Sequence, residues 1–323
     1  RPEPQGARMW YCQEKIPHLS HILFKGYSES MKKSRHLTLT DLVLITILLL
    51  MCLFFAYRIK VGLNYNWAWG SIFQFIFRFD DETGKWVSGL LMTGFYTTIR
   101  LTFWGTIFAT IFGVLMGIAK TGKILFFRWL ATTYVETMRN LPPLVIIFIV
   151  YFFIGDQLLS PLGIDDWAET LSPRTQGLLS TFFARPGFIT AFLSAMITLA
   201  IFEGAYITEI VRAGIESIAK GQSEASHALG MTWYHQMRYI ILPQTFQRIM
   251  PPMAGQFISL IKDSSIVSVI SIQELCFQGV EIMTSTLHTI EIWTVVTLMY
   301  LALTMPCSFL VEQIETRMRR SLR

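Results

Sequence analysis

Four consecutive polar residues, Lys262-Asp263-Ser264-Ser265, interrupt an apolar run between FISLI and IVSVI. A charge at the centre of a bilayer costs about 2.5–3.5 kcal/mol on insertion scales, so such a residue normally faces protein or water and has a partner. Two interpretations are open. The four residues either contribute to a salt bridge inside a helix bundle, or they line a translocation path that meets the ammonium and carboxylate groups of a zwitterion.

Other polar residues in apolar surroundings are candidates for the same path. Glu203, in LAIFEGAYITEIVR, either tunes specificity or bonds within the bundle. Glu209 and Arg212 lie three residues apart on one helix face and are expected to pair. Thr97 and Thr98 are further candidates for the path, although hydroxyl groups in helices often bond only to backbone carbonyls.

Motifs for enzymatic chemistry are absent from the sequence. GIAKTGKI (117–124) has the spacing of a phosphate-binding loop, but Ile124 replaces the hydroxyl residue that binds Mg²⁺, and the preceding segment is apolar enough for a membrane helix. No HExxH, serine elbow or carboxylate-rich metal cluster is present. The four cysteines are scattered and form no metal or disulfide pattern. We therefore expect no catalysis, cofactor or metal.

The composition is that of a membrane protein. Of the 323 residues, 52% are hydrophobic and 15% are charged, against about 25% charged in a soluble domain. Several apolar runs reach the roughly 20 residues that a transmembrane helix needs, and they are too long for barrel strands. We predict an all-α, polytopic membrane protein. The net charge of +5 is explained by basic residues that flank membrane spans, so we expect no nucleic-acid partner.

The apolar runs predict six spans and their connections. The first span, 41–57, follows a polar tail (1–40) and precedes an aromatic-rich interfacial segment (58–89). The others cover about 90–119, 124–155 (interrupted by RNLPP), 188–210, 253–272 and 290–311, with a polar loop at 156–186 and a basic tail at 316–323. Arg139-Asn140 before Pro142-Pro143 is expected to mark the break where the third of these spans enters the membrane.

Lysine and arginine residues indicate the orientation of the chain. Positive charge concentrates in the N-terminal tail, around Lys120 and Lys123, and in the C-terminal tail, whereas the 156–186 loop carries more acidic residues. Six crossings then place both termini in the cytoplasm, and the segment 58–89 on the periplasmic side.

Residues 216–243, here called the polar hairpin, separate the fourth and fifth of the six spans. A short helix is predicted up to Leu229, and Gly230 can adopt the left-handed conformation that ends it. Thr232 is a suitable cap for a second helix. Glu224 and Ala225 would contribute to a small-residue face that can enter the groove of another protein. An ordinary cytoplasmic loop is the alternative interpretation.

Several motifs resemble those of a transporter family. Glu224-Ala225-Ser226, then Gly230 and Ile241-Leu242-Pro243, resemble the EAA signature of ABC-importer permeases, with Ser226 where alanine is usual. YVETMRNLPPLVIIFIVYF, EGAYITEIVRAGIESIAKGQSEASHALGM and SLIKDSSIVSVISIQEL resemble the polar amino acid permeases and occur in that family's order. The resemblance covers roughly residues 90–315; the span 41–57 lies outside it.

The resemblance implies a five-helix permease core plus one N-terminal helix. It implies a transmembrane subunit of an ATP-driven importer for polar amino acids, with the YVETMRNLPPL segment leaning toward the glutamate, aspartate and glutamine branch. A stand-alone channel or secondary transporter for a small polar solute is the alternative.

In the resembling family the hairpin is the coupling helix, which binds a separate ATPase. The positions that correspond to it are Gly221, Glu224, Ala225, Ser226, Leu229, Gly230, Leu242 and Pro243. The positions expected in the substrate path are Glu203, Lys262, Asp263, Ser264, Ser265, Thr97 and Thr98. The implied partners are cytoplasmic ATPase subunits, a second permease chain (identical or paralogous), a periplasmic or lipid-anchored binding protein, the amino-acid substrate and the lipid of a bacterial inner membrane.

Overall fold

The computed structural model describes residues 39–62, 65, 67–82 and 84–321, in two compact units, 1–66 and 67–323. The described part of the first unit contains the helix α2 (Leu39–Gly62). Most of the predicted N-terminal tail (1–40), and the last two residues of the predicted C-terminal tail, lie outside the described residues.

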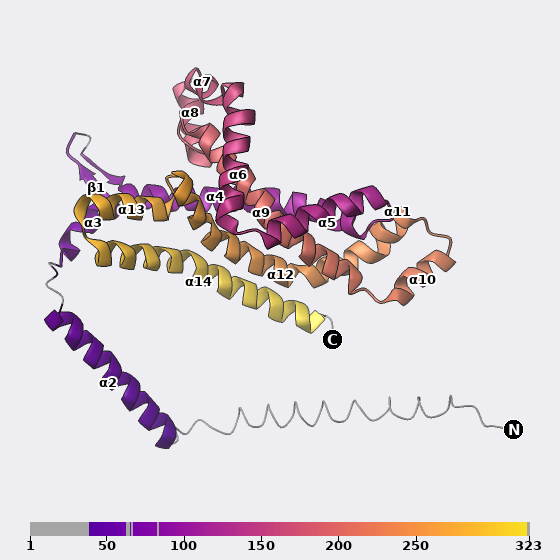
Figure 1. Ribbon diagram of the computed structural model, residues 1–323, viewed down its shortest axis with the longest axis horizontal. Coiled ribbons are helices and arrows are strands. Elements are labelled where there is room, and N and C mark those ends of the chain that lie inside the picture. The colour runs from indigo at the N-terminus through magenta and orange to yellow at the C-terminus, as the bar shows by residue number, and fades with distance from the viewer. Residues whose placement is uncertain (1–38, 63–64, 66, 83, 322–323) are drawn as a thin grey trace. The chain divides into compact units, whose positions relative to one another are not determined.

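The second unit is almost entirely helical, as predicted, and contains one small β-hairpin (Figure 1). Its first eleven elements are η1 (Trp69–Ser71), α3 (Phe73–Ile76), β1 (Phe77–Asp80), β2 (Lys85–Ser88), α4 (Leu90–Thr121), α5 (Leu125–Asn140), α6 (Pro143–Phe152), η2 (Phe153–Leu159), η3 (Ser160–Leu162), α7 (Ile164–Glu169) and α8 (Pro173–Phe182). They are followed by α9 (Ile189–Glu216), α10 (Lys220–Ala228), α11 (Trp233–Gln236), η4 (Met237–Ile241), α12 (Leu242–Asp263), η5 (Ser264–Ile270), α13 (Leu275–Thr286) and α14 (Thr289–Ser321).

Five helical stretches in the described part of the chain are long and apolar enough to cross a membrane. They cover Leu90–Thr121, Pro143–Leu162, Ile189–Glu216, Trp233–Ile270 and Thr289–Arg317. The span predicted at 41–57 falls on α2, whose apolar part, Leu39–Phe55, is shorter than these five. A sixth crossing by α2 therefore stays a prediction.

The span predicted at 124–155 is wrong in its boundaries, because this region forms two separate helices. The first, α5, ends at Asn140 and is followed by Leu141 in an extended conformation (φ −95°, ψ 150°). An extended conformation is what the backbone before a proline prefers, and Pro143 then occupies the first position of α6, where its missing N–H costs nothing. The break predicted before Pro142-Pro143 is present and, as predicted, the crossing begins there; it runs from Pro143 to Leu162.

The helices α4 and α9 run parallel and form the most extensive helix–helix contact in the unit. Gly113 faces Ile207, and Gly117 faces Val211, four residues further along both helices. A Cβ atom on either glycine would lie 2.6 Å from its partner's side chain, so only glycine allows this approach. Thr208 Oγ1 also donates to Gly113 O at 3.3 Å. Since α4 and α9 point the same way, Leu90 and the 163–188 connection lie at one end of the bundle, and Thr121 and the polar hairpin at the other.

Both connections at the Leu90 end contain structure that the sequence did not predict. The 156–186 region, expected as a loop, continues the π-helical η2 and forms η3, α7 and α8. Asp165 Oδ1 accepts from the backbone N–H groups of Ile189 (2.8 Å) and Thr190 (3.2 Å), and so satisfies donors at the start of α9. In the 58–89 region, β1 and β2 pair through Phe79 and Trp86. In Figure 1, β1 and α13 lie at the opposite end of this unit from α10 and α11.

Candidate functional site

The helices of the polar hairpin end and begin at the residues that the sequence predicts. Gly230 adopts φ +75° after α10. Its N–H donates to His227 O (3.0 Å), and Met231 N–H donates to Ser226 O (3.1 Å), which together form a Schellman motif. Thr232 Oγ1 then accepts from His235 N–H at 3.4 Å and caps α11. Local signals therefore end the first short helix and begin the second.

One side of α10 packs on the hairpin itself and the other is free. Ser226 is only 1% exposed, and its Oγ donates to Ser223 O at 2.8 Å. Gln236 Nε2 donates to Ser223 Oγ and so ties α11 to α10. Glu224 and Ala225 are exposed, and Leu229 is 80% exposed. Ser226 therefore supports the fold of the hairpin, while its two predecessors face outward.

The hairpin is attached firmly to the membrane helices. Ile218, which precedes α10, packs with Met237 and Ile241 of η4, and the three side chains form a small buried core. Arg248 Nη1 donates to Ser217 O, and to Ser217 Oγ at 3.0 Å. From Trp233 the chain continues helically to Ile270 through the π-helical η4. Pro243, at the start of α12, has no N–H to donate, and this missing hydrogen bond accompanies the wider turn of η4.

Leu242, Pro243 and Gly221 occupy different parts of this arrangement. Leu242 is half-buried and Pro243 exposed, both at the junction of η4 and α12. Gly221 is exposed in the first turn of α10, with open space around its Cα. The predicted coupling positions thus divide into an exposed face on α10 and a junction that leads into α12.

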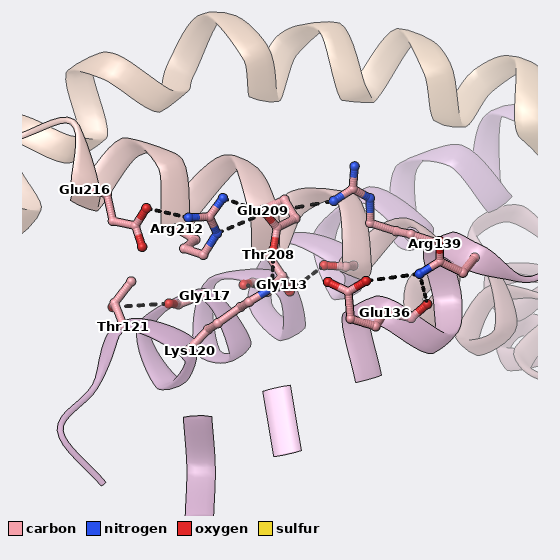
Figure 2. Close-up of polar contacts among 12 residues, drawn as sticks. Gly113, Gly117, Lys120, Thr121, Glu136, Arg139, Thr208, Glu209, Arg212 and Glu216 are labelled. Carbon is pink, nitrogen blue, oxygen red and sulfur yellow. Dashed lines mark hydrogen bonds and ion pairs between the residues drawn. The ribbon is translucent and has the colours of Figure 1, made fainter. Parts of the chain in front are cut away.

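A cluster of ion pairs joins three helices beside the hairpin (Figure 2). The Glu209 carboxylate forms an ion pair with Arg212 at 2.9 Å, which confirms the predicted pair. It forms a second ion pair with Lys120 of α4. Arg139 of α5 lies 3.9 Å from Glu209, and Arg212 also pairs with Glu216. The sequence did not predict Lys120 and Arg139 here, because they are far from Glu209 along the chain.

Two acidic residues approach each other within the bundle. Glu203 of α9 has no exposed surface, and Gln256 Nε2 of α12 donates to its Oε2. Asp263, half-buried at the end of α12, lies within electrostatic reach of Glu203. The Tyr134 hydroxyl donates to Ile201 O close by. The structure therefore brings the two predicted acids together in a polar group formed by α5, α9 and α12.

The rest of the KDSS sequence splits between exposed and buried positions. Lys262 is exposed, and neither it nor Asp263 takes part in an ion pair with any described residue. Ser264 is buried, and its Oγ donates to Ile261 O at 2.7 Å; Ser265 O accepts from Ser268 Oγ at 2.7 Å. Within the described chain, the salt-bridge interpretation of this segment finds no support.

Thr97 and Thr98 have different surroundings. Thr98 is buried, accepts from Leu275 N–H (3.2 Å) and donates to Glu274 Oε2 (3.3 Å). The Tyr300 hydroxyl donates to the same oxygen at 2.7 Å, so Glu274 joins α4, α13 and α14. Thr97 instead lines a cavity of about 980 Å³ at the Leu90 end of the bundle. The Glu274 network is a further feature that the sequence analysis missed.

The described residues contain no group of three or more His, Cys, Asp and Glu side chains placed to hold a metal ion. The arrangement instead offers an exposed helix face tied to a membrane helix, and ionisable groups at several depths of the bundle. Such intramembrane groups typically mark a substrate or ion pathway.

Comparisons of the sequence with known proteins agree with this arrangement. Residues 109–320 match the family described as binding-protein-dependent transport system inner membrane component. The probable glutamine ABC transporter permease protein GlnM of Bacillus subtilis is 32% identical over 232 residues, 72% of this chain and 94% of that protein. The glutamine transport system permease protein GlnP of Escherichia coli K12 is 32% identical over 230 residues (71% and 93%). The glutamate/aspartate import permease protein GltJ of Escherichia coli K12 is 32% identical over 231 residues (72% and 88%).

Solved structures share the fold. The crystal structure of an amino acid ABC transporter with histidines contains a chain that superposes with a TM-score of 0.58 at 27% identity, over 78% of this chain and 100% of that one. A chain of the MetNI methionine ABC transporter, in an inward-facing conformation, superposes with a TM-score of 0.51 at 18% identity, over 71% and 96% of the two chains. The second likeness concerns the fold alone.

Proposed function

The chain belongs to the family of binding-protein-dependent transport system inner membrane components, and from that membership we propose that it imports polar amino acids through coupling of the polar hairpin to a separate ATPase. The observation that carries the coupling proposal is the exposed face of α10, with Glu224, Ala225 and Leu229 free while Ser226 packs inward. A helix with one small, exposed face suits a groove on a partner protein.

The attachment of the hairpin explains how a movement would reach the membrane helices. A displacement of α10 acts on Ser217 and Arg248, and on the core around Met237, which lies in the same continuous helix as Asp263. Movement of that helix would change the spacing between Asp263 and Glu203 on α9. The hairpin would thus alter the polar group in the middle of the bundle without touching the substrate.

The substrate proposal rests on the relatives and on the charged residues inside the bundle. Two of the relatives described above are named for glutamine transport and one for glutamate/aspartate import. Glu203 and Asp263 can receive the ammonium group that every amino acid carries, and Lys262 can face a carboxylate. Glutamate, aspartate and glutamine are therefore the proposed substrates.

The proposed assembly contains partners that the family requires. Two copies of the hairpin would engage two ATPase subunits, so a second permease chain, identical or paralogous, completes the path. A periplasmic or lipid-anchored binding protein would deliver the amino acid at the Leu90 end. The distribution of lysine and arginine favours a bacterial inner membrane location with both termini and the hairpin in the cytoplasm.

The coupling proposal is tested in proteoliposomes that contain the permease, its ATPase and its binding protein. Glu224→Ala and Leu229→Asp are expected to abolish most amino-acid uptake and the stimulation of ATP hydrolysis by the loaded binding protein. Glu281→Ala is a matched control, because Glu281 is exposed on α13 at the other end of the bundle. Normal uptake by both hairpin variants would refute the assignment. Uptake that continues without the ATPase would support a channel or secondary transporter instead.

A further inference from the structure

The cavity at the Leu90 end of the bundle, here called the arginine cavity, is lined by positively charged side chains and by no negatively charged ones among the described residues. Arg78 of β1, Arg100 of α4 and Arg185, just before α9, all line it. The described residues that line it include no aspartate or glutamate. None of the three guanidinium groups takes part in an ion pair within the described chain. The cavity therefore carries three positive charges without a counter-charge from these residues.

Direct contacts join the chain segments that carry two of these arginines. Arg185 lies near enough to Arg100 for the two charges to act on each other. Trp104 Nε1 donates to Phe182 O at 2.9 Å, and its ring stacks on Phe183 at 5.0 Å, so the segment before Arg185 is fixed to α4. Arg100 Nη1 donates to Phe183 O at 3.2 Å, which leaves most of its N–H groups unused. Like charges in one cavity repel each other, and a bound anion would offset that repulsion.

Arg100 lies within a helix that is long and apolar enough to cross a membrane. It lies ten residues from the start of α4, or about 15 Å along the helix axis. Charged residues at such depths generally face a cavity or the interior of the bundle and mark a substrate path. The volume of about 980 Å³ accommodates a free amino acid together with water.

A buried amide adds an independent indication of a ligand. Gln278 of α13 also lines the cavity and is only 4% exposed. Its Oε1 has no hydrogen-bond partner among the described residues. A buried acceptor without a partner is costly, unless a ligand donates to it. None of the arginines that line the cavity donates to this oxygen, whereas the ammonium group of an amino acid is a donor of the kind it lacks.

We propose that the arginine cavity is a binding site for acidic amino acids on their way into the bundle. The carboxylates bind the guanidinium groups of Arg100, Arg185 and Arg78, and the ammonium group donates to Gln278 Oε1. The proposal rests on the import function proposed above and narrows its substrate class to glutamate and aspartate. A site built in this way discriminates against glutamine, which offers one carboxylate instead of two.

The test compares uptake of radiolabelled glutamate and glutamine by the complete transporter with its unchanged binding protein. Arg185→Gln and Arg100→Gln are expected to lower glutamate uptake relative to glutamine uptake by about tenfold or more, since a charge-assisted hydrogen bond is lost. Arg185→Lys keeps the charge and is expected to lose less. Arg174→Gln, on the exposed surface of α8 outside the cavity, is the matched control and is expected to leave both rates unchanged.

Four results would overturn the proposal. The first is unchanged glutamate uptake by both glutamine variants. The second is an equal loss for both amino acids together with weaker docking of the binding protein, which would identify a surface for that protein. The third is a loss that depends on anionic phospholipid in the vesicles and not on the amino acid. The fourth is a wild-type transporter that imports only neutral or cationic amino acids, in which case the proposed import function still stands. If the wild type imports no amino acid with ATP, the proposed function itself fails.

Discussion

Glu209 is the residue whose removal tests the architecture beside the polar hairpin most directly. Its single carboxylate forms ion pairs with Lys120 and Arg212, and a longer one with Arg139 at 3.9 Å (Figure 2). The Glu209→Gln substitution keeps the shape of the side chain and removes its charge. Three cations from three helices then lose their common partner.

The expected loss follows from the exposure of each pair. Removing one partner of a fully buried pair costs about 3–5 kcal/mol, whereas an exposed pair contributes about 0–1 kcal/mol. The side chains of Lys120 and Glu209 keep 12% and 18% of their surface exposed, and that of Arg139 keeps 43%. The Lys120 pair is therefore close to the buried case, and Arg139 contributes little. We expect Glu209→Gln to lower the free energy of unfolding by about 2–3 kcal/mol.

The measurement is unfolding of the purified full-length chain in mixed micelles, with increasing SDS. Glu216→Gln is the matched control, because Glu216 pairs with Arg212 while 57% of its side chain is exposed; its effect should stay within about 0.5 kcal/mol. The double variant Lys120→Met, Glu209→Gln should be less destabilised than the sum of its two single variants. Additive effects, or an unchanged midpoint for Glu209→Gln, would refute the reasoning.

Three further predictions concern packing and the hairpin. Gly113→Ala should destabilise the bundle by about 1–2 kcal/mol in the same assay, because its Cβ would lie 2.6 Å from Ile207, whereas Gly177→Ala, with open space around it in α8, should have no such cost. Gly230→Ala should cost about 1–2 kcal/mol locally, because the residue needs φ +75°, and should speed hydrogen exchange in the hairpin while the membrane helices keep their protection. Ser226→Leu should disrupt the hairpin fold, since Ser226 is 1% exposed, and proteolysis of the full chain would detect it. Ala225→Leu on the free face should leave proteolysis unchanged and still impair ATPase coupling; equal proteolysis of both variants would contradict the assigned faces.

The sequence predicted best those features that depend on neighbouring residues. Gly230 and Thr232 end one helix and begin the next through backbone preferences that need no tertiary contact. Hydropathy likewise indicated that the five crossings exist, because each contains a continuous apolar segment, although it did not fix all of their boundaries. The same criterion failed at α5, because its apolar first turns (LFF) follow Ile124 and were joined to α6 across the polar residues that end α5.

Contacts between distant residues could not be predicted in this way. Thr98 and Glu274 are 176 residues apart, and Lys120 and Glu209 are 89 apart. No local pattern indicates which polar residue meets which, because the choice depends on the relative direction and register of α4, α9 and α13. Thr98 consequently resembled Thr97 in the sequence, whereas only Thr97 lines the arginine cavity.

The register of α4 against α9 also orders the charges along the bundle. Gly113 faces Ile207 and Gly117 faces Val211, so residues 94 apart share a level. Arg100 then lies level with residue 194, about 14 Å from Glu203 along the axis, and Glu209 follows about 9 Å further. Basic groups at the arginine cavity therefore precede the acidic pair of Glu203 and Asp263, and that pair precedes the ion cluster beside the hairpin. On the proposed path, an acidic amino acid attracted by the first group would be repelled by the second unless its ammonium group leads. Movement of the helix that carries Asp263, driven from the hairpin, would act on this second step, so hairpin variants and arginine variants should impair different steps of import.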